Sequence, residues 1–91
     1  FTEEQLKKVL DLLGSDRRII LVNTRVPRPW EAQVNQTLAK VAADYPNAKL
    51  VDWYSASSGH DEYFYQDGVH LNPEGIKAYA SVIAEAIKQQ N

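Results

Sequence analysis

An acid and an imidazole lie three residues apart near the end of the chain, in the run Asp67-Gly68-Val69-His70. A carboxylate that accepts the Nδ1 proton of a histidine fixes the imidazole tautomer, which leaves Nε2 free to take a proton from a hydroxyl nucleophile and later return it. The two side chains would therefore supply two thirds of a hydrolase triad. The same spacing is also common in local hydrogen bonds of surface loops, so the surrounding elements must decide between the two interpretations.

The residues after this pair predict a helix that would hold it in place. Asn72 is a suitable N-cap, and Pro73 suits the first helical position. Apolar residues then recur at helical spacing, at Ile76, Tyr79, Ala80, Ile83 and Ile87. We therefore expect the acid and the histidine on a short loop that is fixed to a core-packed helix.

The upstream sequence predicts alternating helices and strands. The expected elements are a helix at 2–13 behind a Thr2-x-x-Gln5 capping box, a strand at 18–23, a helix that Pro29 opens and Pro46 ends, a strand at 49–53 and a long loop at 54–71. Both strands are unbroken apolar runs, the pattern of strands buried on both faces of a parallel sheet. This order predicts an α/β fold, and we interpret residues 1–91 as the C-terminal part of a larger three-layer α/β/α domain.

The loops after the two strands should meet at one edge of the sheet, because ligands of open α/β sheets bind beyond the carboxyl ends of the strands. The first loop carries Arg25, Arg28 and Trp30, and the second ends in Asp67 and His70. We interpret the two arginines as surface residues that are also able to contact a glycan carboxylate or an acyl donor. Trp30 either stacks on a sugar ring or packs its helix onto the sheet.

Composition excludes several classes of function. The 91 residues carry 10 basic and 12 acidic side chains, a formal charge of −2, with no basic cluster to neutralise the phosphates of a nucleic acid. The absence of cysteine excludes disulfides and thiolate chemistry. His60, Asp61 and Glu62 lack the spacing of metal ligands on a regular element, so we expect a solvated acidic loop and neither a metal nor a cofactor.

Several segments together resemble a known family. The run Asp67-Gly68-Val69-His70, followed by 72–75 (Asn-Pro-Glu-Gly), resembles the last block of the SGNH (GDSL-like) hydrolase superfamily. The segments at 22–31 and 51–54 are similar to the extracellular SGNH domain of bacterial peptidoglycan O-acetyltransferases of the acyltransferase-3 family. This resemblance covers nearly the whole chain and implies a flavodoxin-like fold.

The resemblance implies a Ser-His-Asp mechanism in which His70 is general base and then general acid, oriented by Asp67. The implied reaction moves an acetyl group from a donor to a hydroxyl of cell-wall peptidoglycan, on the extracellular face of a bacterial membrane to which the full-length protein is anchored. An SGNH acetyl-ester hydrolase would use the same residues with water as acceptor. A glycan-binding fragment without catalysis is the alternative from another class.

The nucleophile of that family has no counterpart in this chain. The Gly-Asp-Ser block is absent, and Ser15 in Gly14-Ser15-Asp16 precedes a strand, so it lies at the wrong end of the sheet. Ser55, Ser57 and Ser58 follow no strand-to-helix elbow with backbone donors around it. The chain begins at Phe1 and contains no methionine. We therefore expect an upstream portion of the same domain to supply the serine, and the 91 residues alone to be inactive.

Overall fold

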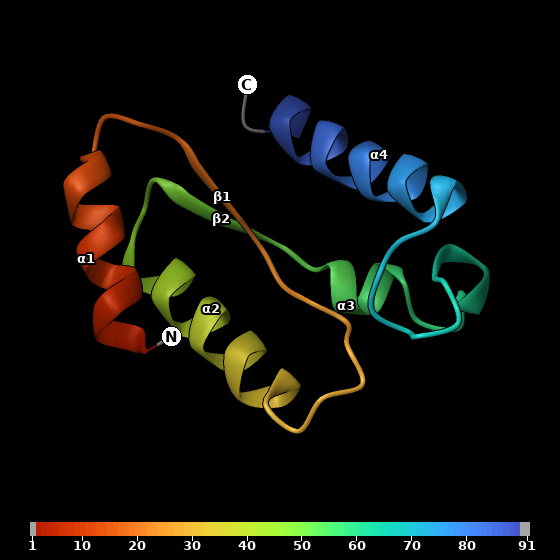
Figure 1. Ribbon diagram of the computed structural model, residues 1–91. Coiled ribbons are helices and arrows are strands. Elements are labelled where there is room, and N and C mark those ends of the chain that lie inside the picture. The colour runs from red at the N-terminus through yellow and green to blue at the C-terminus, as the bar shows by residue number, and fades with distance from the viewer. Residues whose placement is uncertain (1, 90–91) are drawn as a thin grey trace.

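The computed structural model describes residues 2–89 and has the α/β architecture that the sequence predicts. Its elements in chain order are α1 (Glu3–Leu13), β1 (Ile19–Val22), α2 (Glu31–Asp44), β2 (Ala48–Val51), α3 (Trp53–Ala56), the 3-10 helix η1 (Asp61–Tyr63) and α4 (Pro73–Gln89). Figure 1 shows α1 and α2 on one face of the two strands and α4 on the other. The short helices α3 and η1 lie beyond the carboxyl ends of the strands, next to the start of α4.

The predicted capping box opens α1. The Thr2 hydroxyl accepts a hydrogen bond from the Gln5 N–H at 3.2 Å, and the Gln5 side chain accepts one from the Thr2 N–H at 2.9 Å. Leu10 of α1 then packs with Ile19 and Val41 in a buried cluster between the helices and the sheet. Local capping and apolar spacing therefore fix this side of the core together.

The two strands pair in parallel, with Ile19 opposite Ala48 and Val22 opposite Val51. The sequence predicted strands that are buried on both faces, but Ile20, Leu21 and Val22 are only partly buried. The reason is the width of the sheet: with two strands among residues 2–89, β1 and β2 are both edge strands. Side chains on an edge strand have a neighbouring strand on one side only, which leaves them partly accessible.

Two predicted boundaries are wrong by two residues or so. The second helix begins at Glu31 and not at Pro29, because a turn in which the Glu31 N–H donates to the Arg28 carbonyl at 3.2 Å precedes it. The second strand ends at Val51, because the Asp52 carboxylate accepts from the Ser55 N–H at 3.1 Å and caps a new helix. Trp53, expected in the strand, is the first residue of α3 and is 3% exposed.

Between residues 2 and 89, no helix has the length and apolar character needed to cross a bilayer.

Candidate active site

Asp67 and His70 form the hydrogen bond that their spacing predicts. The His70 Nδ1 and the Asp67 Oδ2 are 2.6 Å apart. The other carboxylate oxygen, Oδ1, accepts from the N–H groups of Val69 at 2.9 Å and His70 at 3.1 Å. The His70 side chain is 76% exposed, and its Nε2 has no hydrogen-bond partner among residues 2–89. The pair is therefore a fixed carboxylate that orients an imidazole whose second nitrogen is free to exchange a proton.

The same bonds keep Asp67 ionised. The hydrogen bond from His70, followed by those from the backbone N–H groups of Val69 and His70, lowers the pKa of the Asp67 carboxyl from 3.8 to about 2. Hydrogen bonds to the charged form of a carboxylate favour that form. The carboxylate therefore stays negative at any pH near neutrality, as the orienting acid of a triad must.

A tight turn carries this pair. The Gly68 N–H donates to the Tyr65 carbonyl at 3.0 Å, and the Tyr65 N–H donates to the His70 carbonyl at 2.9 Å. Gly68 has a φ of 70°, in the left-handed region that residues with a Cβ rarely adopt. A bridge between Phe64 and Leu71 closes the base of the turn. The Asp67–His70 segment is thus the tip of a small hairpin, here called the dyad hairpin (residues 64–71).

Asn72 ties the dyad hairpin to α4. Its side-chain oxygen accepts from the Gly75 N–H at 2.9 Å, which is the cap that the sequence predicts. Its side-chain NH2 donates to the Glu62 carbonyl at 2.6 Å, and its backbone N–H donates to the Tyr63 carbonyl at 2.9 Å. Gly75 lies so close to the Tyr63 carbonyl that a Cβ there would be far inside van der Waals contact. Asn72 therefore joins η1, which precedes the dyad hairpin, to the start of α4, which follows it.

The carboxyl ends of the two strands are linked as the topology predicts. The buried Asn23 donates from its side chain to the Asp52 Oδ1 at 2.8 Å and accepts from the Tyr54 N–H at 2.8 Å. The hydrogen bond from Asn23, and next that from Ser55, lowers the pKa of Asp52. The two loops therefore start from one rigid edge of the sheet.

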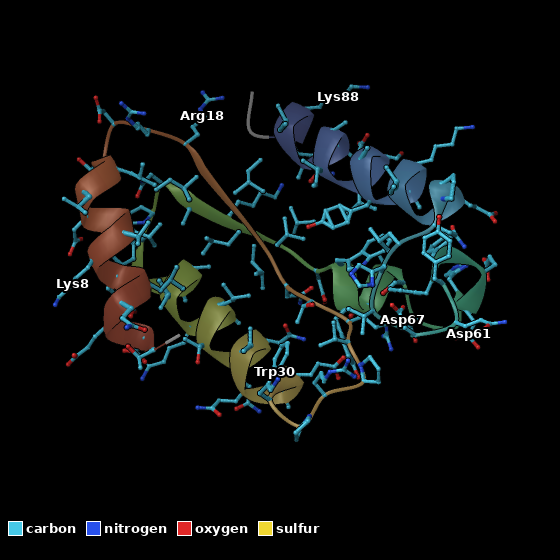
Figure 2. All side chains as sticks on the ribbon, viewed as in Figure 1. Lys8, Arg18, Trp30, Asp61, Asp67 and Lys88 are labelled. Atoms are coloured by element: carbon cyan, nitrogen blue, oxygen red, sulfur yellow. The ribbon has the colours of Figure 1, made fainter. Side chains whose placement is uncertain are left out.

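The structure brings one of the three predicted binding residues to the dyad hairpin. Arg25 lines a pocket of about 630 Å³ together with Tyr65, Gln66 and Gly68 of the hairpin. Arg28 donates to the Pro27 carbonyl at 3.0 Å and is exposed. Trp30, 48% exposed, lines a different hollow on α2. Figure 2 shows Trp30 at the start of α2, whereas Asp61 lies in η1 and Asp67 lies near that helix.

Arg25 is held rigidly where it lines the pocket. Its Nε donates to the Ser57 Oγ at 2.8 Å, its Nη2 donates to the Tyr54 carbonyl, and its guanidinium carbon lies 4.0 Å from the centre of the Tyr54 ring. These contacts join the loop after β1 to α3. A guanidinium has five N–H donors, so donors remain for a ligand.

Two of the three loop serines, Ser55 and Ser57, have hydroxyl groups that stabilise the loop structure. The Ser57 hydroxyl is 1% exposed and donates to the Trp53 carbonyl at 2.7 Å. The Ser55 hydroxyl donates to the Asp52 Oδ2 at 2.7 Å. Neither hydroxyl is bonded to His70, so neither is arranged as its nucleophile.

A second histidine and acid pair lies in the same loop. The His60 Nδ1 is 2.7 Å from the Glu62 Oε2, and this hydrogen bond lowers the pKa of Glu62. The His60 ring stacks on Tyr63 with 4.6 Å between centroids and 6° between planes, and Tyr63 in turn stacks on Trp53 at 5.8 Å. Within residues 2–89, no three His, Asp or Glu side chains group as metal ligands would.

Sequence reasoning missed the polar residues that hold the loops. Asn35 of α2 accepts from the Thr24 N–H at 2.9 Å and donates to its carbonyl at 2.8 Å, and Glu31 accepts from the Val26 N–H at 2.7 Å. The sequence places Asn23 at the end of the first predicted strand. The signal that could have identified Asn23 is a polar residue at the end of an apolar strand. A buried side-chain amide at that position must find hydrogen-bond partners in the neighbouring loops.

Comparison with known proteins finds relatives along nearly the whole chain. Peptidoglycan O-acetyltransferase OatA of Listeria monocytogenes is 47% identical over 89 residues, which is 98% of this chain and 14% of that protein. A Staphylococcus aureus protein, named provisionally as an O-acetyltransferase, is 48% identical over 90 residues, or 99% of this chain and 15% of that protein. YrhL of Bacillus subtilis has the provisional name of peptidoglycan O-acetyltransferase. It is 46% identical over 88 residues, which is 97% of this chain and 14% of that protein.

No protein-family model matches the chain. The 91 residues span about 14% to 15% of the length of the curated relatives they match, and they include the Asp67–His70 pair. The chain is thus similar throughout to a short part of proteins that are named as peptidoglycan O-acetyltransferases.

Proposed function

We propose that this chain is the part of a peptidoglycan O-acetyltransferase that supplies the histidine and the acid of a Ser-His-Asp triad. The observation that carries the proposal is the 2.6 Å bond between His70 Nδ1 and Asp67 Oδ2, with the opposite side of the ring exposed. The names of the relatives support the substrate class. The serine then belongs to sequence outside these 91 residues, in an SGNH-type domain that the longer protein completes.

In this mechanism His70 Nε2 takes the proton of the serine hydroxyl as the serine oxygen attacks the carbonyl carbon of an acetyl donor. The imidazolium returns the proton to the leaving group, and an acetyl-serine ester remains. His70 then takes the proton of a glycan hydroxyl, whose oxygen attacks the ester, and the proton passes back to the serine. Asp67 remains ionised throughout and stabilises each imidazolium.

An acceptor in the cell wall requires a site outside the cytoplasm. We therefore place the domain on the extracellular face of the bacterial membrane, in a full-length protein anchored there. Arg25 is the residue of the first loop that is positioned to contact the acceptor, because it lines the pocket beside the dyad hairpin.

The test is acetyl transfer by the complete protein carrying His70→Ala, with His60→Ala as the matched control. Loss of a triad histidine lowers turnover by about 10³-fold or more, whereas removal of the stacked His60 should leave it within about threefold. If the acetyl group still goes to water when a glycan acceptor is added, the enzyme is instead an esterase. Equal rates in the wild-type and His70→Ala proteins would refute the triad and favour a noncatalytic glycan-binding fragment.

A further inference from the structure

The pocket beside the dyad hairpin lies between two loops that are far apart in sequence. The loop after β1 contributes Arg25, Val26 and Pro27, and the dyad hairpin contributes Phe64, Tyr65 and Gly68. A Cβ placed on Gly68 would lie 3.4 Å from Pro27, so the two walls meet closely at this point. The volume of about 630 Å³ is that of a small-molecule site.

The charged groups on the pocket walls have a net charge of −1. Arg25 is the cation, and Glu31 and Asp61 are the two acids. One oxygen of the Glu31 carboxylate accepts from the Val26 N–H at 2.7 Å, so this acid is fixed and keeps a second oxygen for a ligand. A negatively charged ligand would face two carboxylates, and an apolar ligand would leave the remaining donors of Arg25 and the second oxygen of Glu31 without a ligand partner. A neutral ligand that both donates and accepts hydrogen bonds suits this set.

The aromatic groups indicate the shape of that ligand. Phe64 and Tyr65 line the pocket beside the polar groups, and Tyr65 is 54% exposed, although it belongs to a well-bonded hairpin. An exposed aromatic face packs well against an apolar C–H surface of a ligand. Hydroxyl groups at the edge of the same ligand are then able to hydrogen-bond to charged side chains. A pyranose ring has both features.

We propose that this pocket binds a neutral hexosamine ring of the glycan acceptor, with Tyr65 as the stacking platform and Arg25, Glu31 and Asp61 as partners of its hydroxyl and amide groups. The proposal rests on the proposed function for its substrate. His70 does not line the pocket, although four residues of its hairpin do. The ring in this pocket is therefore a different sugar from the one that receives the acetyl group.

The test measures binding of a tetramer of β-1,4-linked N-acetylglucosamine to the complete protein by titration calorimetry. Tyr65→Ala should raise Kd by about 10-fold, whereas Tyr65→Phe, which keeps the ring, should stay within about twofold of wild type. An equally long oligomer of galacturonate, which is anionic, should bind about 10-fold more weakly than the neutral tetramer. Asp61→Asn should reduce that preference.

The failure of this proposal differs from failure of the proposed function. His70→Ala should bind the neutral tetramer as wild type does, because His70 is outside the pocket. Unchanged binding in Tyr65→Ala, or equal binding of the neutral and anionic oligomers, would overturn the pocket assignment and leave the triad intact. Loss of binding in Tyr65→Ala together with wild-type turnover in His70→Ala would instead support the pocket and refute the triad.

Discussion

Two histidine and acid pairs in one loop have nearly the same hydrogen bond and different surroundings. The Nδ1 to carboxylate distance is 2.6 Å for His70 and Asp67 and 2.7 Å for His60 and Glu62. The Asp67 carboxylate also accepts two backbone N–H groups, and the His70 ring protrudes into solvent. The His60 ring lies flat on Tyr63, at the end of a series of aromatic contacts that reaches the core.

The comparison teaches that the hydrogen bond between an imidazole and a carboxylate does not identify a catalytic pair. Its position relative to the fold decides the role. The His70 side chain at the tip of the hairpin is 76% exposed, whereas the pair at 60 and 62 helps to pack η1. Asp67 is itself held by two backbone N–H groups and orients His70, whereas the His60 ring is held both by Glu62 and by stacking on Tyr63.

The largest expected effect separates the two acids. Asp67→Asn in the complete protein should lower acetyl transfer by about 10³- to 10⁴-fold, because an amide in this position favours the wrong imidazole tautomer. Glu62→Gln should leave the rate within about threefold, since stacking on Tyr63 still orients His60. Rates measured under saturating donor, with circular dichroism to compare the folds, check both. A similar loss of rate in both variants would show that the two acids do not differ in their role in catalysis.

A smaller effect concerns the support that the two pairs share. Gly75→Ala should destabilise the protein by about 3 kcal/mol, because the new Cβ collides with the Tyr63 carbonyl and must push η1 away from α4. Gly59→Ala is the control: φ is 76° there, but the space around it is open, so about 1 kcal/mol is expected from backbone strain alone. Urea unfolding measures both values. Equal losses of unfolding free energy would mean that the close approach of Gly75 to the Tyr63 carbonyl does not limit the residue at position 75.

The smallest effect is on the pKa values of the two acids. His70→Ala should raise the pKa of Asp67 from about 2 but leave it below 3.8, because the Val69 N–H bond persists. His60→Ala should raise the pKa of Glu62, whose largest cause of lowering is the bond from His60. Carboxyl carbon shifts followed by NMR against pH give both values.

The sign of the accompanying stability change follows from the lowered pKa of Asp67. The ionised carboxylate stabilises the folded state above its unfolded pKa near 4, and this stabilisation is lost as the pH falls from about 4 to about 2. The variant His70→Ala should lose less stability over that range. An Asp67 pKa that does not move in this variant would show that the backbone bonds alone hold the carboxylate ionised.

Much of the fold was predictable because its signals are local. The capping box of α1, the Asn72 cap of α4 and the parallel pairing of the two apolar runs all follow from residue type and spacing, and the structure confirms them. The start of α2 and the end of β2 were predicted wrongly. In each case a side chain or a turn competed for the same backbone groups, as Asp52 does at the start of α3.

The candidate site was predictable to a smaller extent. The acid, the histidine and the loop that carries them could be named, since three residues in a turn determine whether a carboxylate reaches an imidazole. The pocket could not, because its walls are 25–31 and 61–68, which only the packing of η1 and the hairpin brings together. The separation of Trp30 from Arg25 was also not predicted: Trp30 is the N-cap residue of α2 and lines a different hollow from Arg25.

The sequence by itself determined the dyad, the caps and the order of the elements, because each depends on atoms a few residues apart. The tertiary structure decided which of the two histidines protrudes into solvent and which is stacked on an aromatic ring. Both lie within a few residues of an acid, so the presence of a nearby acid does not by itself predict which ring is stacked. Their burial depends on where Tyr63 and α4 meet, and that contact is a property of the whole fold.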